Sequence, residues 1–84
     1  MATSFFHEET LPLDDLGNAT LVRYYFDDIT GEVITRSFYL LAVSGRTEFI
    51  DNERIPFADL RVDLKPRLIE FLGQKKRMDL RRAS

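Results

Sequence analysis

The side chains that could carry acid–base chemistry in this chain are a single histidine and two pairs of adjacent acids. They are His7, Asp14-Asp15 and Asp27-Asp28. An imidazole that acts as a general acid or base needs a partner group and a pocket, whereas His7 stands beside Glu8 and Glu9 near the N-terminus. We therefore interpret His7 as a solvated surface histidine.

The acid pairs do not converge on a metal ion or on a shared proton. Neighbouring residues on a strand point to opposite faces, and the spacing lacks the alternating oxygens and sixth-position glycine of a calcium loop. We interpret both pairs as turn and cap acids. The chain has no cysteine, and its four glycines form no phosphate-binding or dinucleotide-binding motif. The sequence therefore predicts no catalytic residue, no cofactor and no metal site, and hence a protein that is not an enzyme.

The charges are divided unevenly along the chain. Residues 1–51 hold nine acids and three bases, whereas residues 52–84 hold five acids and nine bases. The formal net charge of −2 therefore combines an acidic first part with a basic end. The predicted electrostatic docking element consists of Lys75, Lys76, Arg77, Arg81 and Arg82. Long-range charge of this kind governs encounter and choice of partner rather than fold.

Length and composition indicate one small folded domain over residues 1–84. The 44% apolar content is too high for a disordered chain of 84 residues. The N-terminus lacks the basic region and apolar core of an export signal, and the longest apolar run, Phe38–Val43, is far shorter than a membrane span. We therefore expect a cytoplasmic protein with no membrane partner.

The clearest local pattern is a β-hairpin. Residues 19–26 and 32–43 are rich in β-branched and aromatic side chains, and Asp27 and Gly31 bracket a turn between them. A type I turn closed by a glycine bulge fits these positions. The pattern places a strand on each side of this turn.

The turn also predicts which residues face one another. A type I turn with a glycine bulge sets Phe26 opposite Ile34. A register shifted by one residue sets Arg23 directly opposite Arg36, and like charges across neighbouring strands repel. We therefore expect the first register.

Further strands are predicted after the hairpin. Ser44-Gly45 favours a second turn, which leads into a strand over Thr47–Asp51, and residues 51–54 favour another turn. Pro56 indicates a strand edge or a break. Residues 59–64 alternate polar and apolar as a half-buried strand does, and a helix over Phe57–Leu64 is the competing interpretation.

A helix is predicted near the C-terminus. Pro66 suits its first turn, Asp63 is a candidate cap, and the residues that share its apolar face are Leu64, Leu68, Phe71 and Leu72. Gly73 either ends the helix or is tolerated inside it, and in the second case the helix runs to about Arg82. The predicted fold is α+β: a small antiparallel β-meander of three to five strands with a C-terminal α-helix packed on one face. Its parts are a partly extended segment over 1–18, the sheet over 19–64, and the helix with its basic tail over 65–82.

The expected register divides the hairpin into two faces. The face expected beneath the helix carries Val22, Tyr24, Phe26, Ile34, Phe38 and Leu40. The other face should be polar in a free two-layer domain, yet it carries Leu21, Tyr25, Val33, Tyr39 and Leu41 among Arg23, Thr35 and Ser37. Aromatic, aliphatic and arginine side chains together are typical of an interface. The predicted partner-binding residues are Leu21, Arg23, Tyr25, Tyr39 and Leu41.

An alternative keeps this second face inside the protein. The N-terminal segment would fold back over it, and its apolar side chains would be the cover: Phe5, Phe6, Leu11 and Leu13. The sequence does not decide between an interface and this internal cover.

The leading functional hypothesis is a protein–protein interaction module that serves as a small regulatory or accessory subunit of a larger assembly. Its partner would be another protein, a second copy of the chain included. The alternative is a nucleic-acid-associated protein whose basic tail contacts phosphates. Aromatic residues on a sheet can stack bases, but the part of the chain that forms the sheet is the acidic part and repels phosphate. The first hypothesis is therefore preferred.

Overall fold

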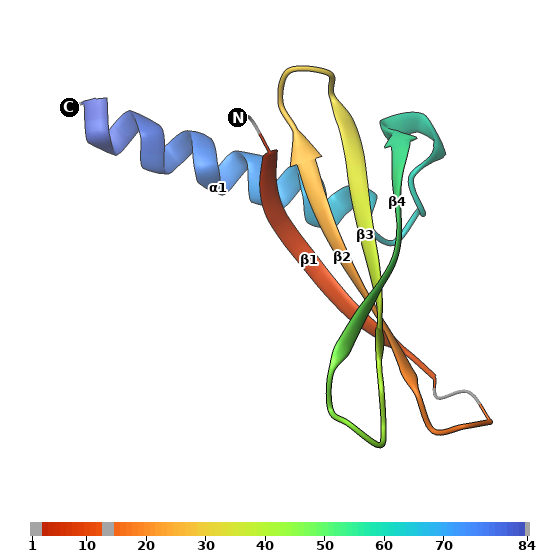
Figure 1. Cartoon of the computed structure of the whole chain (residues 1–84). Helices are drawn as coiled ribbons and strands as arrows, with labels where there is room; N and C mark the ends of the chain where they lie inside the picture. The colour runs from red at the N-terminus through yellow and green to blue at the C-terminus, as the bar shows by residue number, and fades with distance from the viewer. Residues whose placement is uncertain (1–2, 13–14, 84) are drawn as a thin grey trace.

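In a computed structural model, the chain forms one antiparallel sheet, and a helix crosses one face of it (Figure 1). The strands β1 (Thr3–Leu11), β2 (Ala19–Asp27), β3 (Glu32–Leu40) and β4 (Thr47–Pro56) pair in chain order, and the 3₁₀ turn η1 (Phe57–Asp59) precedes the helix α1 (Lys65–Ala83). The structure describes residues 3–12 and 15–83, with side chains as far as Met78. The predicted α+β meander with a C-terminal helix is confirmed.

Glycines with positive φ close both hairpin turns that the sequence predicts. Gly31 has φ +75°, and its N–H donates to the carbonyl oxygen of Asp27 at 2.8 Å. The Asp27 carboxylate also accepts the N–H of Ile29 at 3.0 Å, which fixes the first half of the turn. Gly45 has φ +68°, and its N–H donates to the carbonyl oxygen of Leu41 at 2.8 Å.

The predicted register between β2 and β3 is wrong by one residue. Arg23 lies directly opposite Arg36, in the arrangement that charge repulsion was expected to exclude. Both guanidinium groups have other partners. Arg23 donates to Glu8 of β1 at 2.9 Å and lies over the ring of Phe38 at 5.6 Å, while Arg36 lies over the ring of Tyr25 at 5.8 Å. These contacts offset the repulsion between the two bases.

The shift exchanges the two faces of β3. Val33 is fully buried beneath the helix, and three further residues share its side of the sheet: Thr35, Ser37 and Tyr39. Ile34, Phe38 and Leu40, which were expected in the core, lie on the opposite side. The β2 part of the prediction is correct, because Val22 and Tyr24 are buried on the helix side. One residue of register therefore decides which side chains of β3 are exposed.

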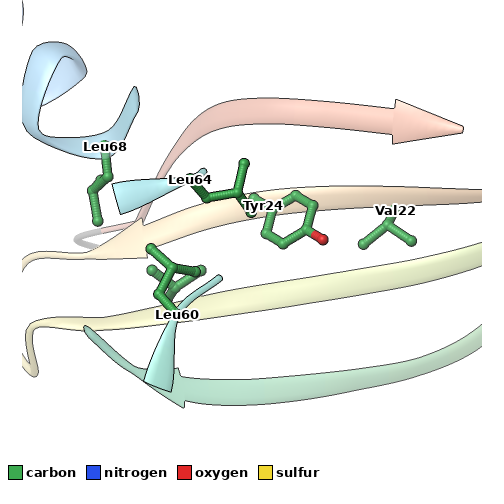
Figure 2. Packing of buried hydrophobic residues seen from close by; sticks show 6 residues of the cluster. Val22, Tyr24, Leu60, Leu64 and Leu68 are labelled. Carbon is green, nitrogen blue, oxygen red and sulfur yellow. The ribbon is translucent and has the colours of Figure 1, made fainter. Parts of the chain in front are cut away.

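The hydrophobic core lies between the sheet and the first turns of α1 (Figure 2). Its buried members are Val22, Tyr24, Val33, Leu60, Leu64 and Leu68. Leu64 and Leu68 are one helical turn apart and are 1% and 0% exposed. Phe71 continues this stripe, and its ring lies 6.0 Å from that of Phe6 on β1. The predicted apolar face of the helix is therefore the face that contacts the sheet.

The segment before α1 is neither the expected strand nor the competing helix. The turn η1 covers three residues only, Leu60 and Leu64 are buried, and Val62 is 81% exposed. A four-residue spacing between buried leucines belongs to a turn that leads into a helix, so the alternation over 59–64 was misleading. The strand predicted over Thr47–Asp51 instead continues through the predicted turn at 51–54 and ends at Pro56.

The N-terminal segment extends the sheet rather than folding over it. β1 pairs with β2 from Thr3 to Leu11, with a bulge between Phe5 and His7. The sheet thus spans residues 3–56 instead of the expected 19–64. Since β1 is an edge strand, it does not cover the second face of the hairpin, and the internal-cover alternative is wrong for the described residues.

Gly73 is tolerated inside α1, which continues to Ala83. The helix crosses β1, where Lys75 donates from Nζ to Ser4 Oγ at 3.0 Å, and then runs beyond the edge of the sheet (Figure 1). The described part of the chain contains no helix that is long and apolar enough to cross a bilayer.

Candidate protein-binding face

The sheet face turned away from α1 is the candidate functional site, and we call it the open face. Strand alternation and the pairing register assign to it Phe5, Leu21, Arg23, Tyr25, Ile34, Arg36, Phe38, Leu40 and Phe49. The helix lies on the other side of the sheet, and no described element covers the open face. Phe5 remains 49% exposed and Phe49 55% exposed as a result.

Two aromatic side chains and one arginine form each of two rows across the open face. The first row is Phe5, Tyr25 and Arg36, and the second row is Arg23, Phe38 and Phe49. The Phe5 and Tyr25 rings meet edge to face at 5.6 Å, and the Phe38 and Phe49 rings do so at 5.8 Å. In each row an arginine lies over the inner ring. These contacts hold large side chains in fixed positions, so less side-chain conformational entropy is lost when a partner binds.

Ion pairs surround one end of the open face. Arg54 donates to Asp27 at 3.1 Å and contacts Glu32 at 3.5 Å. The hydrogen bond from Arg54, supported by the N–H of Ile29, holds the pKa of the Asp27 carboxyl below its usual range. Arg36 is exposed and forms no ion pair with any residue of the described chain. Its charge is therefore available to a partner.

A hollow of about 630 Å³ opens beside this charge. It is lined by Thr3, Tyr25, Asp27, Ile29, Ile34, Arg36, Asn52, Glu53 and Arg54. Tyr25 and Ile34 lie opposite each other on neighbouring strands and supply its apolar surface, and Asp27, Arg36 and Arg54 supply charged groups. Apolar surface with a few polar groups at its border is the usual form of a pocket that accepts one anchoring side chain.

The structure brings together three of the five predicted partner-binding residues. Leu21, Arg23 and Tyr25 share the open face. Tyr39 does not, because it pairs with Thr20 and lies on the helix side. Leu41 lies beyond β3 in the second turn, where its N–H donates to the carbonyl oxygen of Arg46 at 2.9 Å. The prediction that these two residues share a face with Tyr25 is wrong. The one-residue shift of register moves Tyr39 to the helix side, and β3 ends before Leu41.

Six residues of the open face were not predicted as binding residues: Phe5, Ile34, Arg36, Phe38, Leu40 and Phe49. A signal for the four on β3 exists in the sequence, since an aspartate such as Asp27 can bond the N–H two residues further on and so favour a tighter turn. The observed turn is one residue shorter than the predicted one. Phe5 and Phe49 depend on which strands become the neighbours of the hairpin, and no local pattern specifies that.

The predicted electrostatic docking element lies away from the open face. Lys75 is held against β1 by its hydrogen bond to Ser4, while Lys76 and Arg77 are exposed. The side chains of Arg81 and Arg82 lie outside the described part of the structure. The described bases of this element, Lys75, Lys76 and Arg77, thus belong to the helix on the other side of the sheet from the aromatic rows.

A polar cluster beneath the helix is the other concentration of ionisable groups. Tyr24 donates to Glu9 at 2.6 Å, and Arg61 contacts both Glu9 and Asp63. Burial and the hydrogen bond to Glu9 raise the pKa of Tyr24 to about 12. Burial would raise the pKa of Glu9, but the hydrogen bonds from Arg61 and Tyr24 outweigh it and leave the pKa below its usual value. We interpret the cluster as a structural link between β1 and the segment before α1.

The described residues form no metal-binding arrangement. No group of three or more histidine, aspartate or glutamate side chains in residues 3–12 and 15–78 is placed to hold an ion. His7 is partly buried, and its ring lies 5.5 Å from that of Tyr24. Its contact with a core residue does not fit the solvated surface position that the sequence suggested.

Comparison of the chain with protein-family models, with curated proteins and with solved structures gave no match. The function of the protein is therefore inferred from its residues and their geometry.

Proposed function

We propose that this protein is a non-enzymatic protein–protein interaction module, a small regulatory or accessory subunit of a larger assembly, and that it binds its partner through the open face. The observation that supports this most is the pair of aromatic–arginine rows on a sheet face that no described element covers. A free two-layer domain normally has a polar outer face. Apolar and aromatic surface here costs solubility unless a partner covers it.

The composition of the open face fits protein better than nucleic acid. Aromatic and arginine residues at the centre, with ion pairs at the border, match the core and rim of protein interfaces. The arginines are largely balanced, because Glu8 pairs with Arg23 and Asp27 pairs with Arg54. A surface that binds a phosphate backbone needs an excess of positive charge.

The nucleic-acid alternative requires the aromatic rings and the basic tail to face the same strand. The part of α1 that carries Lys76 and Arg77 runs beyond β1 on the helix side, whereas the aromatic rows lie on the other side. One strand of nucleic acid would have to pass around the sheet edge to contact both. This geometry favours a protein partner.

The proposal is tested by affinity capture from native lysate, with and without nuclease. The bait variants are Arg36→Glu combined with Phe49→Ser on the open face, and Ile69→Ser on α1 as a matched control of an exposed apolar residue. We expect a stoichiometric protein that survives nuclease, is kept by the control and is lost by the open-face variant. A captured species that disappears with nuclease would instead support nucleic-acid binding. Equal capture by all baits would remove the open face from the proposal.

A further inference from the structure

The C-terminal part of α1 has no sheet beneath it. Contacts of Phe71 with Phe6 and of Lys75 with Ser4 mark where the helix crosses β1, the edge strand. Residues 76–83 therefore extend beyond the sheet by about 12 Å, at 1.5 Å per residue, and we call them the overhang. Met78 follows Phe71 by seven residues, so it continues the sheet-facing side of the helix, yet it is 55% exposed.

The same face of the sheet also has a part that no described residue covers. α1 crosses only one end of the strands (Figure 1), and a shallow groove of about 390 Å³ lies toward the other end. It is lined by Leu11, Thr20, Val22, Tyr24, Thr35, Ser37, Tyr39, Ile50, Asp51, Glu53 and Ile55. Leu11 and Tyr39 are each 41% exposed, and Ile50 is 37% exposed. We call this surface the uncovered half.

A two-fold axis places these two surfaces against each other. The axis is perpendicular to the sheet and passes beside the middle of β1, so that β1 of a second copy lies antiparallel to it. The end of β1 that contains Ser4 then lies level with the end of the second copy's β1 that contains Leu11. The overhang leaves the first copy at this level and meets the uncovered half of the second. Because strands are about 4.8 Å apart, 12 Å of helix spans the first two strands of that copy.

The charges of the two surfaces are complementary. Lys76 and Arg77 of the overhang are exposed and basic. Asp15 is exposed in the loop that follows β1 at the Leu11 end of the sheet, which is the end that the overhang of a second copy meets. Within one copy these bases lie near Ser4, at the other end of β1, so they do not meet Asp15. A second copy brings opposite charges together and favours this orientation.

We propose that the chain forms a two-fold homodimer in which the β1 edges are adjacent and each overhang packs on the uncovered half of the other copy. The interface is isologous, so it closes at two copies. It covers an exposed edge strand, which otherwise invites uncontrolled pairing. It also covers Met78 and Leu11, which are exposed in the single chain. The two open faces then lie on the same side of the dimer, available to two partner sites.

Cross-linking tests this arrangement directly, because the chain has no native cysteine. The variant Leu11→Cys combined with Met78→Cys is expected to give a covalent dimer on mild oxidation. Ser4 marks the helix crossing, and Leu11 is seven residues further along an extended strand, about 23 Å away. A disulfide between positions 11 and 78 must therefore join two copies. The matched control is Leu40→Cys with Met78→Cys, since Leu40 is also 41% exposed but lies on the open face.

The mass in solution gives an independent measurement. Light scattering on the native chain is expected to give twice the 9.8 kDa chain mass. Met78→Asp should raise the dimer dissociation constant at least tenfold, while Ile69→Asp, at a position 61% exposed over the sheet of its own copy, should not. A single-chain mass at every concentration would overturn the proposal. A dimer that cross-links through positions 40 and 78 rather than 11 and 78 would also overturn it.

Discussion

Arg23 on β2 and Arg36 on β3 lie directly opposite each other in the middle of the sheet. Each guanidinium turns away from the other toward the aromatic ring diagonally across the strand pair, Phe38 for Arg23 and Tyr25 for Arg36. Arg23 also reaches Glu8 on β1. Diagonal neighbours on antiparallel strands are within reach of long side chains, so two like charges can occupy one cross-strand pair.

The compensated pair predicts that Arg36→Glu changes stability little. The substitution gives Arg23 an opposite charge across the strands, worth about 0.2–1 kcal/mol. It removes the contact with Tyr25, worth about 0.5–1 kcal/mol at an exposed site. We expect the free energy of unfolding in urea to change by no more than about 0.5 kcal/mol, the range of ordinary surface substitutions.

The control for this prediction is Arg23→Glu. It sets a new carboxylate opposite Glu8, with which Arg23 is paired in the native chain, so it should destabilise the protein more than Arg36→Glu does. If the two variants lowered the free energy of unfolding equally, Glu8 would not hold Arg23 in place. The ion pair with Glu8 would then not explain why this register is tolerated.

The sequence was sufficient for features that depend on neighbouring residues. Gly31 and Gly45 marked the two turns, and the spacing of Leu64 and Leu68 marked the buried side of α1. The register was not predictable in the same way, because the partner that makes Arg23 tolerable is Glu8, fifteen positions away on a strand that no pattern assigned as a neighbour. Repulsion between the two arginines is a local effect, whereas the contact that compensates it comes from a distant part of the chain.

The residues of the candidate site were predictable only where they depend on local pattern. Leu21, Arg23 and Tyr25 were found because β2 was assigned correctly, and alternation then determined their face. Tyr39 was assigned to the open face because one residue of register moves every side chain of β3 to the other side. Phe49 could not have been found, since a bulge between Ser37 and Phe38 in the pairing with β4 determines which way it points.

Truncation of the helix stripe should reveal how much of the stability comes from the core beneath α1. Leu68 is fully buried, and Leu68→Ala is expected to cost about 2–5 kcal/mol through lost transfer energy and a cavity. Ile69→Ala, at the next position and 61% exposed, should cost less than about 1 kcal/mol. Denaturant unfolding of both variants measures the difference. Similar losses at the two positions would contradict the assigned orientation of the helix.

Two glycines should respond to alanine in opposite directions. Gly31 has φ +75°, a conformation that costs a residue with a side chain about 1–2 kcal/mol, so Gly31→Ala should lower the free energy of unfolding by about that amount. Gly73 lies inside α1, and a Cβ built there meets no atom within 4 Å. Gly73→Ala should therefore raise the free energy of unfolding by about 0.5–1 kcal/mol. Destabilisation by Gly73→Ala would show that the helix does not continue past this position.

Alkaline pH should weaken the fold through Tyr24. Burial and the hydrogen bond to Glu9 raise the pKa of its phenol to about 12 in the folded protein, whereas an unfolded chain has the ordinary value near 10. A group whose pKa is raised on folding adds stability below the unfolded value and loses it as the pH rises through the folded value. The free energy of unfolding should thus fall by roughly 2 kcal/mol between pH 10 and 12.

Comparison with phenylalanine variants isolates this contribution from the titration of other groups. At neutral pH, Tyr24→Phe should be less stable than the native chain, because it lacks the hydrogen bond to Glu9. Since phenylalanine cannot ionise, this difference in the free energy of unfolding should shrink as the pH rises from 10 to 12. Tyr39→Phe, at a position 41% exposed, should leave the alkaline step in place. If the step persisted in Tyr24→Phe, the phenol would not be the group whose ionisation opposes folding, and the link between β1 and the segment before α1 would have to depend on Arg61 alone.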